Sequence, residues 1–374
     1  MKVKRAFFIV LTAFFITTID SSLMAADTTD IDQVRNKTVL DDRDRAVIDA
    51  FLQKAVGEFL TTKDFVTIAK LRTVILKNQK SNQPNQNQYA DQFSESSYKY
   101  IQQAFQQALI LRPPERQTRV IVNLLILIDN LQDPQLADLA MEKLNHENMA
   151  VRYWAVHALT NTGIFKQLNS EETQNRKLAL QITEQLKKIV DSSSPEILGL
   201  IAQFTANQNL PEAEELLLQI ADLRIQRYAD WTVKYERLEI AILKLLESKI
   251  ATPSLSPSGT TTSSSGNPAA AQRFAQLYSY AIERLIKGRN LNASQQQQLV
   301  TVLAEIEEKC ITKLLGREQN AIRTAVAGRN MPALEAEQAR LLGNALPSKL
   351  NFDYGTDSNG TRRTAPLPLP DQPL

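Results

Sequence analysis

Apolar residues recur at helical spacing along almost the whole chain, and this period restricts the fold more than any other feature. Between residues 42 and 345 they return every three to four positions, and no stretch shows the alternation that marks a half-buried strand. Only 11 of the 374 residues are glycine, about 3% against a usual ~7%. Tight hairpins and phosphate-binding loops need the backbone freedom of glycine, so they are disfavoured. The sequence therefore predicts an all-α fold.

The expected helices have recognisable starts and stops. Apolar faces predict helices over about 42–59 and 63–80. The run at 120–128 is apolar on nearly every side, which predicts a helix buried between neighbours. Pro195 and Pro211 stand where a first helical turn begins, a position that tolerates proline because its N–H has no intrahelical partner.

Composition divides the chain into four parts after its N-terminal segment. A helical array is predicted over 42–250, followed by a Pro/Ser/Thr/Gly linker at 252–268 that has no apolar face and is expected to be disordered. A smaller helical block follows at 269–345. The proline-rich tail, 348–374, is also expected to be disordered. The alternative for this tail is a polyproline-type ligand.

One segment narrows the type of helical fold. In Asn148–Leu159 the residues Val151, Ala155, Ala158 and Leu159 lie at i, i+4, i+7 and i+8, which is one helix face. This pattern, with Arg after the first Val, resembles the second helix of a HEAT-like repeat. The resemblance implies an α-solenoid of stacked antiparallel helix pairs, because a single repeat cannot bury its own apolar face.

The polar residues around this segment agree with the resemblance only in part. In the HEAT family the arginine at the position of Arg152 commonly bonds an acidic residue of a neighbouring repeat. The family often has Asp a few residues earlier, where this chain has His146. The resemblance implies a polar ladder between repeats, and this departure puts that ladder in doubt.

The first 25 residues have the pattern of a secretory signal peptide. Three basic residues precede an apolar run from Ala6 to Ile19, and a small-residue site ends at Ala25 and Ala26. The run is shorter than the roughly 20 residues of a membrane-spanning helix. Cleavage after Ala25 or Ala26 is therefore expected, with no integral membrane segment left. The expected location is the periplasm or the extracellular space.

The charge balance argues against nucleic acid as a partner. Removing residues 1–25 takes away Lys2, Lys4, Arg5 and one acid, Asp20, so the 43 Lys and Arg and the 41 Asp and Glu become 40 of each. Nucleic acid and anionic lipid both attract a basic surface, which a neutral chain with interspersed charges does not offer. A protein or peptide is the expected partner.

No catalytic, cofactor-binding or metal-binding residue is predicted. His146 and His157 have no Asp, Glu or Cys at a metal-ligand spacing. The single cysteine, Cys310, falls in step with apolar neighbours and is expected in the core. The pair Ser96 and Lys99 has the Ser-x-x-Lys spacing of penicillin-interacting enzymes without their companion motifs, so it is interpreted as chance.

Carboxylates and tryptophans leave two further possibilities. The adjacent pairs Glu171-Glu172 and Glu214-Glu215 point apart on a helix, so neither forms a shared acid–base site by itself. Trp154 and Trp231 could line a groove, although packing is the commoner role of such residues.

Three functions remain open. The first is an exported, non-catalytic helical-repeat scaffold in the cell envelope that binds a protein or peptide. The second is an all-helical envelope enzyme, such as one acting on cell-wall polymer, in which folding brings together Glu172, Glu215 or Glu236. The third is a structural envelope component held by its tail.

Overall fold

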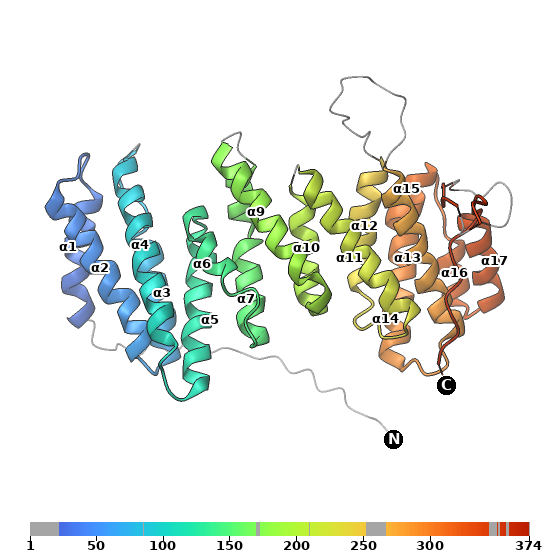
Figure 1. Cartoon of the computed structure of the whole chain (residues 1–374), viewed down its shortest axis with the longest axis horizontal. Helices are drawn as coiled ribbons and strands as arrows, with labels where there is room; N and C mark the ends of the chain where they lie inside the picture. Colours follow the sequence, from blue (N-terminus) through green and yellow to red (C-terminus); the bar gives the residue numbers. More distant parts are fainter. Residues whose placement is uncertain are drawn as a thin grey trace, which may run out of the picture. The chain divides into compact units, whose positions relative to one another are not determined.

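The computed structural model of the chain describes residues 22–84, 86–169, 173–208, 210–251, 267–343, 350, 352–356 and 359–373 (Figure 1). These residues form helices joined by short connections, and their only β pairing is an isolated bridge between Thr356 and Arg362. The predicted all-α fold is confirmed. Among the described residues, no helix combines the length and the apolar character that crossing a bilayer requires.

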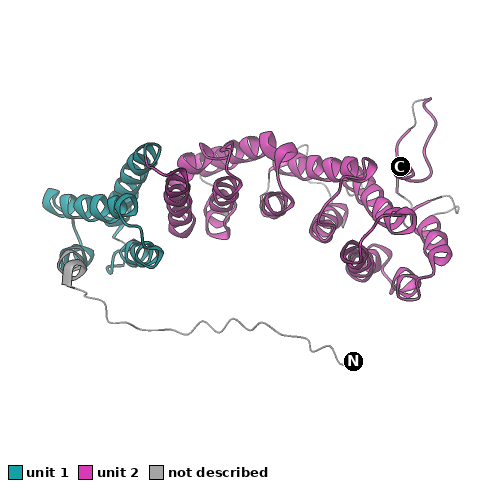
Figure 2. Cartoon of the chain, turned by 90° about the horizontal axis from the view of Figure 1, so that it is seen from below, with its two compact units in different colours: residues 1–110 teal, residues 111–374 magenta. Residues whose placement is uncertain are grey.

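The chain divides into two compact units, residues 1–110 and 111–374 (Figure 2). This division falls inside the array predicted over 42–250. The predicted linker lies largely outside the described residues, and the helices before and after it contact each other directly. The structure therefore joins the later part of the array and the C-terminal block in one unit.

Unit 1 consists of four helices: α1 (Ser22–Arg35), α2 (Asp42–Thr61), α3 (Phe65–Lys77) and α4 (Asn87–Ala108). The central helix α2 contacts the other three. It starts where Asp41 forms a capping box with Asp44, each side chain accepting the other's backbone N–H. The predicted signal residues 1–21 lie outside the described residues, and α1 begins before the expected cleavage site.

Unit 2 contains the remaining helices: α5 (Pro114–Leu131), α6 (Ala137–Met141), α7 (Met149–Leu159), α8 (Thr162–Leu168), α9 (Thr173–Ile189), α10 (Pro195–Ala206), α11 (Pro211–Ala229), α12 (Leu238–Ala251), α13 (Pro268–Lys287), α14 (Ala293–Ile306), α15 (Thr312–Leu315), α16 (Ala321–Ala327) and α17 (Met331–Leu342). Proline occupies the first turn of α5, α10, α11 and α13, as the sequence predicts for α10 and α11.

The helices of unit 2 stack in two layers. Helices α7, α10, α12 and α14 contact one another in succession, and α9, α11 and α13 do the same in the second layer. The layers are joined by the pairs α10/α11 and α12/α13. The α12/α13 pair is antiparallel, because the backbone N–H of Asn267 before α13 reaches the carbonyl of Lys249 near the end of α12. Unit 2 is thus a HEAT-like α-solenoid, as residues 148–159 predict.

The residues that carry the HEAT resemblance lie where that fold requires them. Val151, Ala155, Ala158 and Leu159 are all fully buried, and α7 contacts α5, α6 and α10. Small alanines on this face let neighbouring helices approach closely. Arg152 differs from the family pattern, because its guanidinium donates to the backbone carbonyls of His146 (3.0 Å) and Glu147 (3.3 Å). The arginine stabilises its own turn rather than the neighbouring repeat.

The tail differs from the predicted disorder wherever the structure describes it. Tyr354 is buried, and its hydroxyl donates to the carbonyl of Leu342 at the end of α17. Phe352 packs edge-on against Phe274 of α13. Residues 359–373 then run in an extended conformation alongside α13 (Figure 1). Composition misses this because the tail is ordered by contacts with distant residues and not by any fold of its own.

Candidate peptide-binding groove

The helix α13 presents a row of long polar side chains to the tail. Gln276, Glu283 and Lys287 lie at i, i+7 and i+11, which places them on one helix face. The helix starts at the N-cap Asn267, whose side chain accepts the N–H groups of Ala269 and Ala270. Its apolar residues are buried against α11, α12, α14 and α17. The polar row is therefore fixed on a rigid element.

Gln276 binds the tail in the manner of a neighbouring strand. Its side-chain N–H donates to the carbonyl of Leu367 (2.9 Å), and its side-chain oxygen accepts the N–H of the same residue (2.8 Å). One amide side chain thus satisfies both backbone groups of one tail residue. Such bonds recognise the backbone of an extended segment and not its side chains.

Glu283 and Lys287 bind the next alternate residue. The N–H of Leu369 donates to Oε2 of Glu283 (2.9 Å), and Nζ of Lys287 donates to the carbonyl of Leu369 (3.0 Å). Glu283 and Lys287 also form an ion pair at 2.7 Å. The side chain of Leu369 is buried, with 2% of its surface exposed. A charged pair in partly buried surroundings is a strong hydrogen-bonding partner for a peptide group.

Trp231 closes the C-terminal side of this contact. Its indole N–H donates to the carbonyl of Pro370 (2.9 Å). Trp231 lies in the turn between α11 and α12, where both Trp231 and Tyr235 have φ near +58° and +57°. Left-handed backbone is uncommon for bulky residues and marks a segment held by its surroundings. Beyond this point the N–H of Arg289 donates to the side chain of Gln372 (3.1 Å).

The prolines of the tail match the donors and acceptors that the groove offers. Between Pro366 and Pro370 only Leu367 and Leu369 carry a backbone N–H, and both are bonded to α13. The three prolines need no acceptor, because proline has no N–H and its φ is fixed. The segment therefore fits the groove with few unpaired groups and little conformational freedom to lose.

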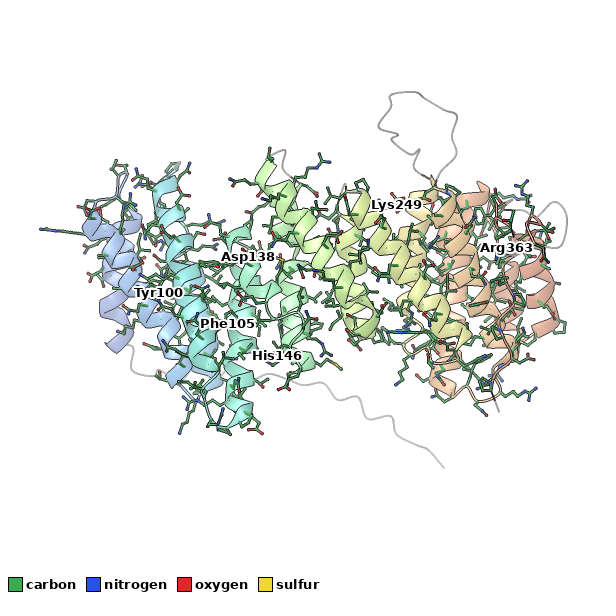
Figure 3. All side chains as sticks on the ribbon, viewed as in Figure 1. Tyr100, Phe105, Asp138, His146, Lys249 and Arg363 are labelled. Atoms are coloured by element: carbon green, nitrogen blue, oxygen red, sulfur yellow. The ribbon has the colours of Figure 1, made fainter. Side chains whose placement is uncertain are left out.

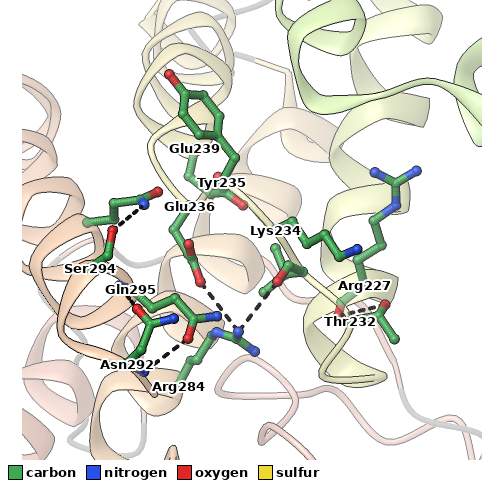
Figure 4. A network of polar contacts seen from close by, with 12 residues as sticks. Arg227, Thr232, Lys234, Tyr235, Glu236, Glu239, Arg284, Asn292, Ser294 and Gln295 are labelled. Atoms are coloured by element: carbon green, nitrogen blue, oxygen red, sulfur yellow. Dashed lines mark hydrogen bonds and ion pairs between the residues drawn. The ribbon is translucent and has the colours of Figure 1, made fainter. Parts of the chain in front are cut away.

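A buried cluster of charges lies behind Trp231 (Figure 4). The guanidinium of Arg284 stands 5.4 Å from the centre of the Trp231 ring and pairs with Glu236 at 3.3 Å. Arg224 pairs with Glu239 at 2.5 Å, and both side chains are fully buried. Buried charges require partners, so these two pairs fix the turn that carries Trp231.

The cluster perturbs the acid at its centre. Burial raises the pKa of Glu239 to about 7, and the charge of Arg224 opposes that rise. Second oxygens of both Glu236 and Glu239 are buried and lack a hydrogen-bond partner among the described residues. The ion pairs thus hold the turn at an electrostatic cost.

A cavity of about 360 Å³ remains between the tail, α13 and α17. Pro366 and Pro368 line one side of it, and Ser279, Glu335 and Gln338 line the other. The tail therefore does not fill the space next to its own prolines.

The two histidines do not form part of this groove. His146 precedes α7 (Figure 3), where its Nδ1 accepts the N–H of Asn148 and burial lowers its pKa. His157 on α7 lies 2.9 Å from Asp129 on α5, and Asn161 donates to the same carboxylate. The spacing in sequence, 28 residues, gives no hint of this His–Asp contact. No group of three potential metal ligands occurs in the described part of the chain.

The other residues considered for chemistry are held in ordinary structural roles. Cys310 is buried in the core as predicted, and burial raises its pKa to about 12. Ser96 and Lys99 both bind Asp49, at 2.5 and 2.8 Å. This hydrogen bond with Asp49 raises the pKa of Lys99 to about 12, so its amine stays protonated at neutral pH and cannot serve as a base. Trp154 stacks with Tyr153 and His157 on α7.

The candidate carboxylates are not brought together. Glu215 is exposed and pairs with Lys187 at 3.1 Å, whereas Glu236 is buried against Arg284. Glu214 accepts a bond from Asn267. Glu171 and Glu172 lie outside the described residues. The two described members of the proposed enzyme site therefore serve different, already paired cations.

Sequence reasoning did not identify Gln276, Glu283 or Lys287 as functional residues. They lie 82 to 91 positions from the tail residues that they bind. The one available hint is the alternation of Pro and Leu over 366–370, which leaves an N–H at every second residue only. Trp231 was considered for a groove, and the structure places it at one.

Comparison with known proteins shows likeness at the level of fold. No protein-family model matches the sequence, and no curated protein matches it. The structure of Kap121p bound to Pho4p is 14% identical over 86% of this chain and 34% of Kap121p, with a TM-score of 0.35. Kap121p bound to RanGTP gives 15% identity, 86% and 33% coverage and a TM-score of 0.33.

An engineered protein is also similar, at 14% identity over 86% of this chain and 96% of its own, with a TM-score of 0.19. The chain spans about a third of the length of Kap121p. These similarities bear on the fold alone, and the helix contacts within unit 2 establish the stack independently of them.

Proposed function

We propose that this protein is an exported, non-catalytic scaffold that binds a protein partner through an extended segment of that partner. The observation that carries the proposal is the face of α13, where Gln276, Glu283 and Lys287 satisfy the backbone of an extended chain. Rigid stacked helices suit this role because they hold the polar row in place without a partner. The paired states of Glu215 and Glu236 give the alternative enzyme no support.

Site-specific photo-crosslinking tests the proposal. A photoreactive residue replaces Gln276 in a chain that ends at Thr364, so that the groove is free, and the chain is expressed in its source cell. We expect one defined protein to be crosslinked, since the probe lies on the binding face. The matched control carries the same probe at Gln297, an exposed residue of α14. Identical crosslinked proteins from both positions would contradict a partner site on α13.

A further inference from the structure

The contacts between the tail and unit 2 are those of a bound peptide. Every hydrogen bond to Leu367 and Leu369 comes from a side chain of α13, and the bond to Pro370 comes from Trp231. None of these bonds requires the peptide to be covalently joined to the solenoid. The same side chains can bind any extended segment with N–H groups two residues apart.

The side chains of the tail define what the groove selects. Leu369 is buried, whereas Leu367 has 49% of its surface exposed. A ligand therefore needs an apolar residue at the position of Leu369 and tolerates change at that of Leu367. Proline at the intervening positions avoids a buried N–H without an acceptor, which would weaken binding. The frame Pro-Leu-Pro-Leu-Pro meets both requirements.

The tail also blocks this groove against other ligands. A tethered segment acts at an effective concentration in the millimolar range, so a free peptide with the same contacts competes poorly. The cavity of about 360 Å³ next to Pro366 and Pro368 shows that the tail leaves contacts unused. A partner with larger side chains at these positions gains contacts that the tail does not make.

We propose that residues 365–373 are a tethered, autoinhibitory ligand, and that the groove of α13 and Trp231 binds an extended partner peptide with the Pro-Leu-Pro-Leu-Pro frame. This inference rests on the proposed scaffold function and adds the ligand class and its regulation. A partner is favoured over the tail of a second copy because an identical tail gains no contact in the cavity.

Peptide binding by chains with and without the tail tests this inference. The probe is a fluorescent synthetic peptide of residues 364–373, measured by fluorescence anisotropy against the full chain and the chain ending at Thr364. We expect the truncated chain to bind at least about tenfold more tightly, because its groove is free. The Leu369→Asp peptide should not bind, and Gln276→Ala in the truncated chain should weaken binding.

A second variant guards against a folding defect in the truncated chain. Leu369→Asp in the full chain should release the tail while keeping its length, and should also admit the probe. The inference is overturned if the full chain and both released forms bind the probe equally, or if neither released form binds it. A dimer of the full chain in light scattering that disappears on truncation would instead identify a second copy as the occupant.

The two proposals can fail separately. Crosslinking from Gln276 with no binding of the proline–leucine probe would leave the scaffold function in place and refute this ligand class. Probe binding without a crosslinked partner in the source cell would refute the scaffold function while the groove itself remains.

Discussion

Glu239 and Arg224 illustrate how single buried charges position the binding turn. Their side chains are fully buried and 2.5 Å apart, yet burial raises the pKa of Glu239 to about 7. The cost of desolvating the carboxylate therefore exceeds what its partner returns. An apolar pair would avoid this cost, so the ion pair has a value in fixing the turn of Trp231 that stability alone does not explain.

This pair should make stability depend on pH. The folded pKa of Glu239 lies above its unfolded value near 4.5, so the folded state binds the proton more tightly between these two pH values. The free energy of unfolding should fall as pH rises from about 5 to 7, by up to ~1.4 kcal/mol per pH unit, and level off above. Urea unfolding at pH 5, 6, 7 and 8 measures this.

The informative quantity is the difference between the unmodified chain and Glu239→Gln, since glutamine does not titrate. The matched control is Glu215→Gln, whose carboxylate is exposed and should leave the pH profile unchanged. Parallel profiles for Glu239→Gln and the unmodified chain would show that burial does not perturb this acid.

At the scale of elements, α13 depends on the tail fitting closely against the end of α17. A Cβ built on Gly343 would lie 2.6 Å from Cα of Ala365, closer than real contacts allow. The glycine thus permits the tail to leave α17 and run along α13. Backbone approach of this kind is a reason for glycine that helical periodicity does not reveal.

Gly343→Ala should therefore displace the tail and leave the helices folded. We expect the amides of Leu367 and Leu369 to exchange with deuterium several-fold faster, as their acceptors on α13 are lost. Gly57→Ala is the matched control, because a Cβ there meets nothing within 4 Å in the helix α2. That change should raise the free energy of unfolding by about 0.5–1 kcal/mol. Unchanged exchange at both leucines would argue against a closely packed tail.

At the scale of the whole molecule, export decides which partners the scaffold can meet. The N-terminal pattern predicts cleavage after Ala25 or Ala26. Intact-mass measurement of the chain from its source cell should give a protein that starts at Ala26 or Asp27. A chain that keeps Met1–Ala25 would contradict the predicted secretion. The helical fold of α1 around this site is formed by backbone bonds that cleavage would shorten by about one turn.

The helices and their buried faces followed from the sequence because both are local properties. A period of 3.6 residues identifies the core face of α7 through Val151, Ala155 and Leu159, and each proves fully buried. Asp64 and Asn148 cap α3 and α7 with their own side chains. Cys310 was placed in the core by the same periodicity. These features depend on residues only a few positions apart.

The groove depends instead on residues far apart in the chain, which only the tertiary structure brings together. Gln276, Glu283 and Trp231 are separated from their tail partners by 91, 86 and 139 residues. Composition alone predicted a disordered tail, because a proline-rich segment cannot bury an apolar face by itself. It becomes ordered on a surface that exists only once α11, α12, α13 and α17 have packed, since that packing aligns the polar row of α13 with Trp231.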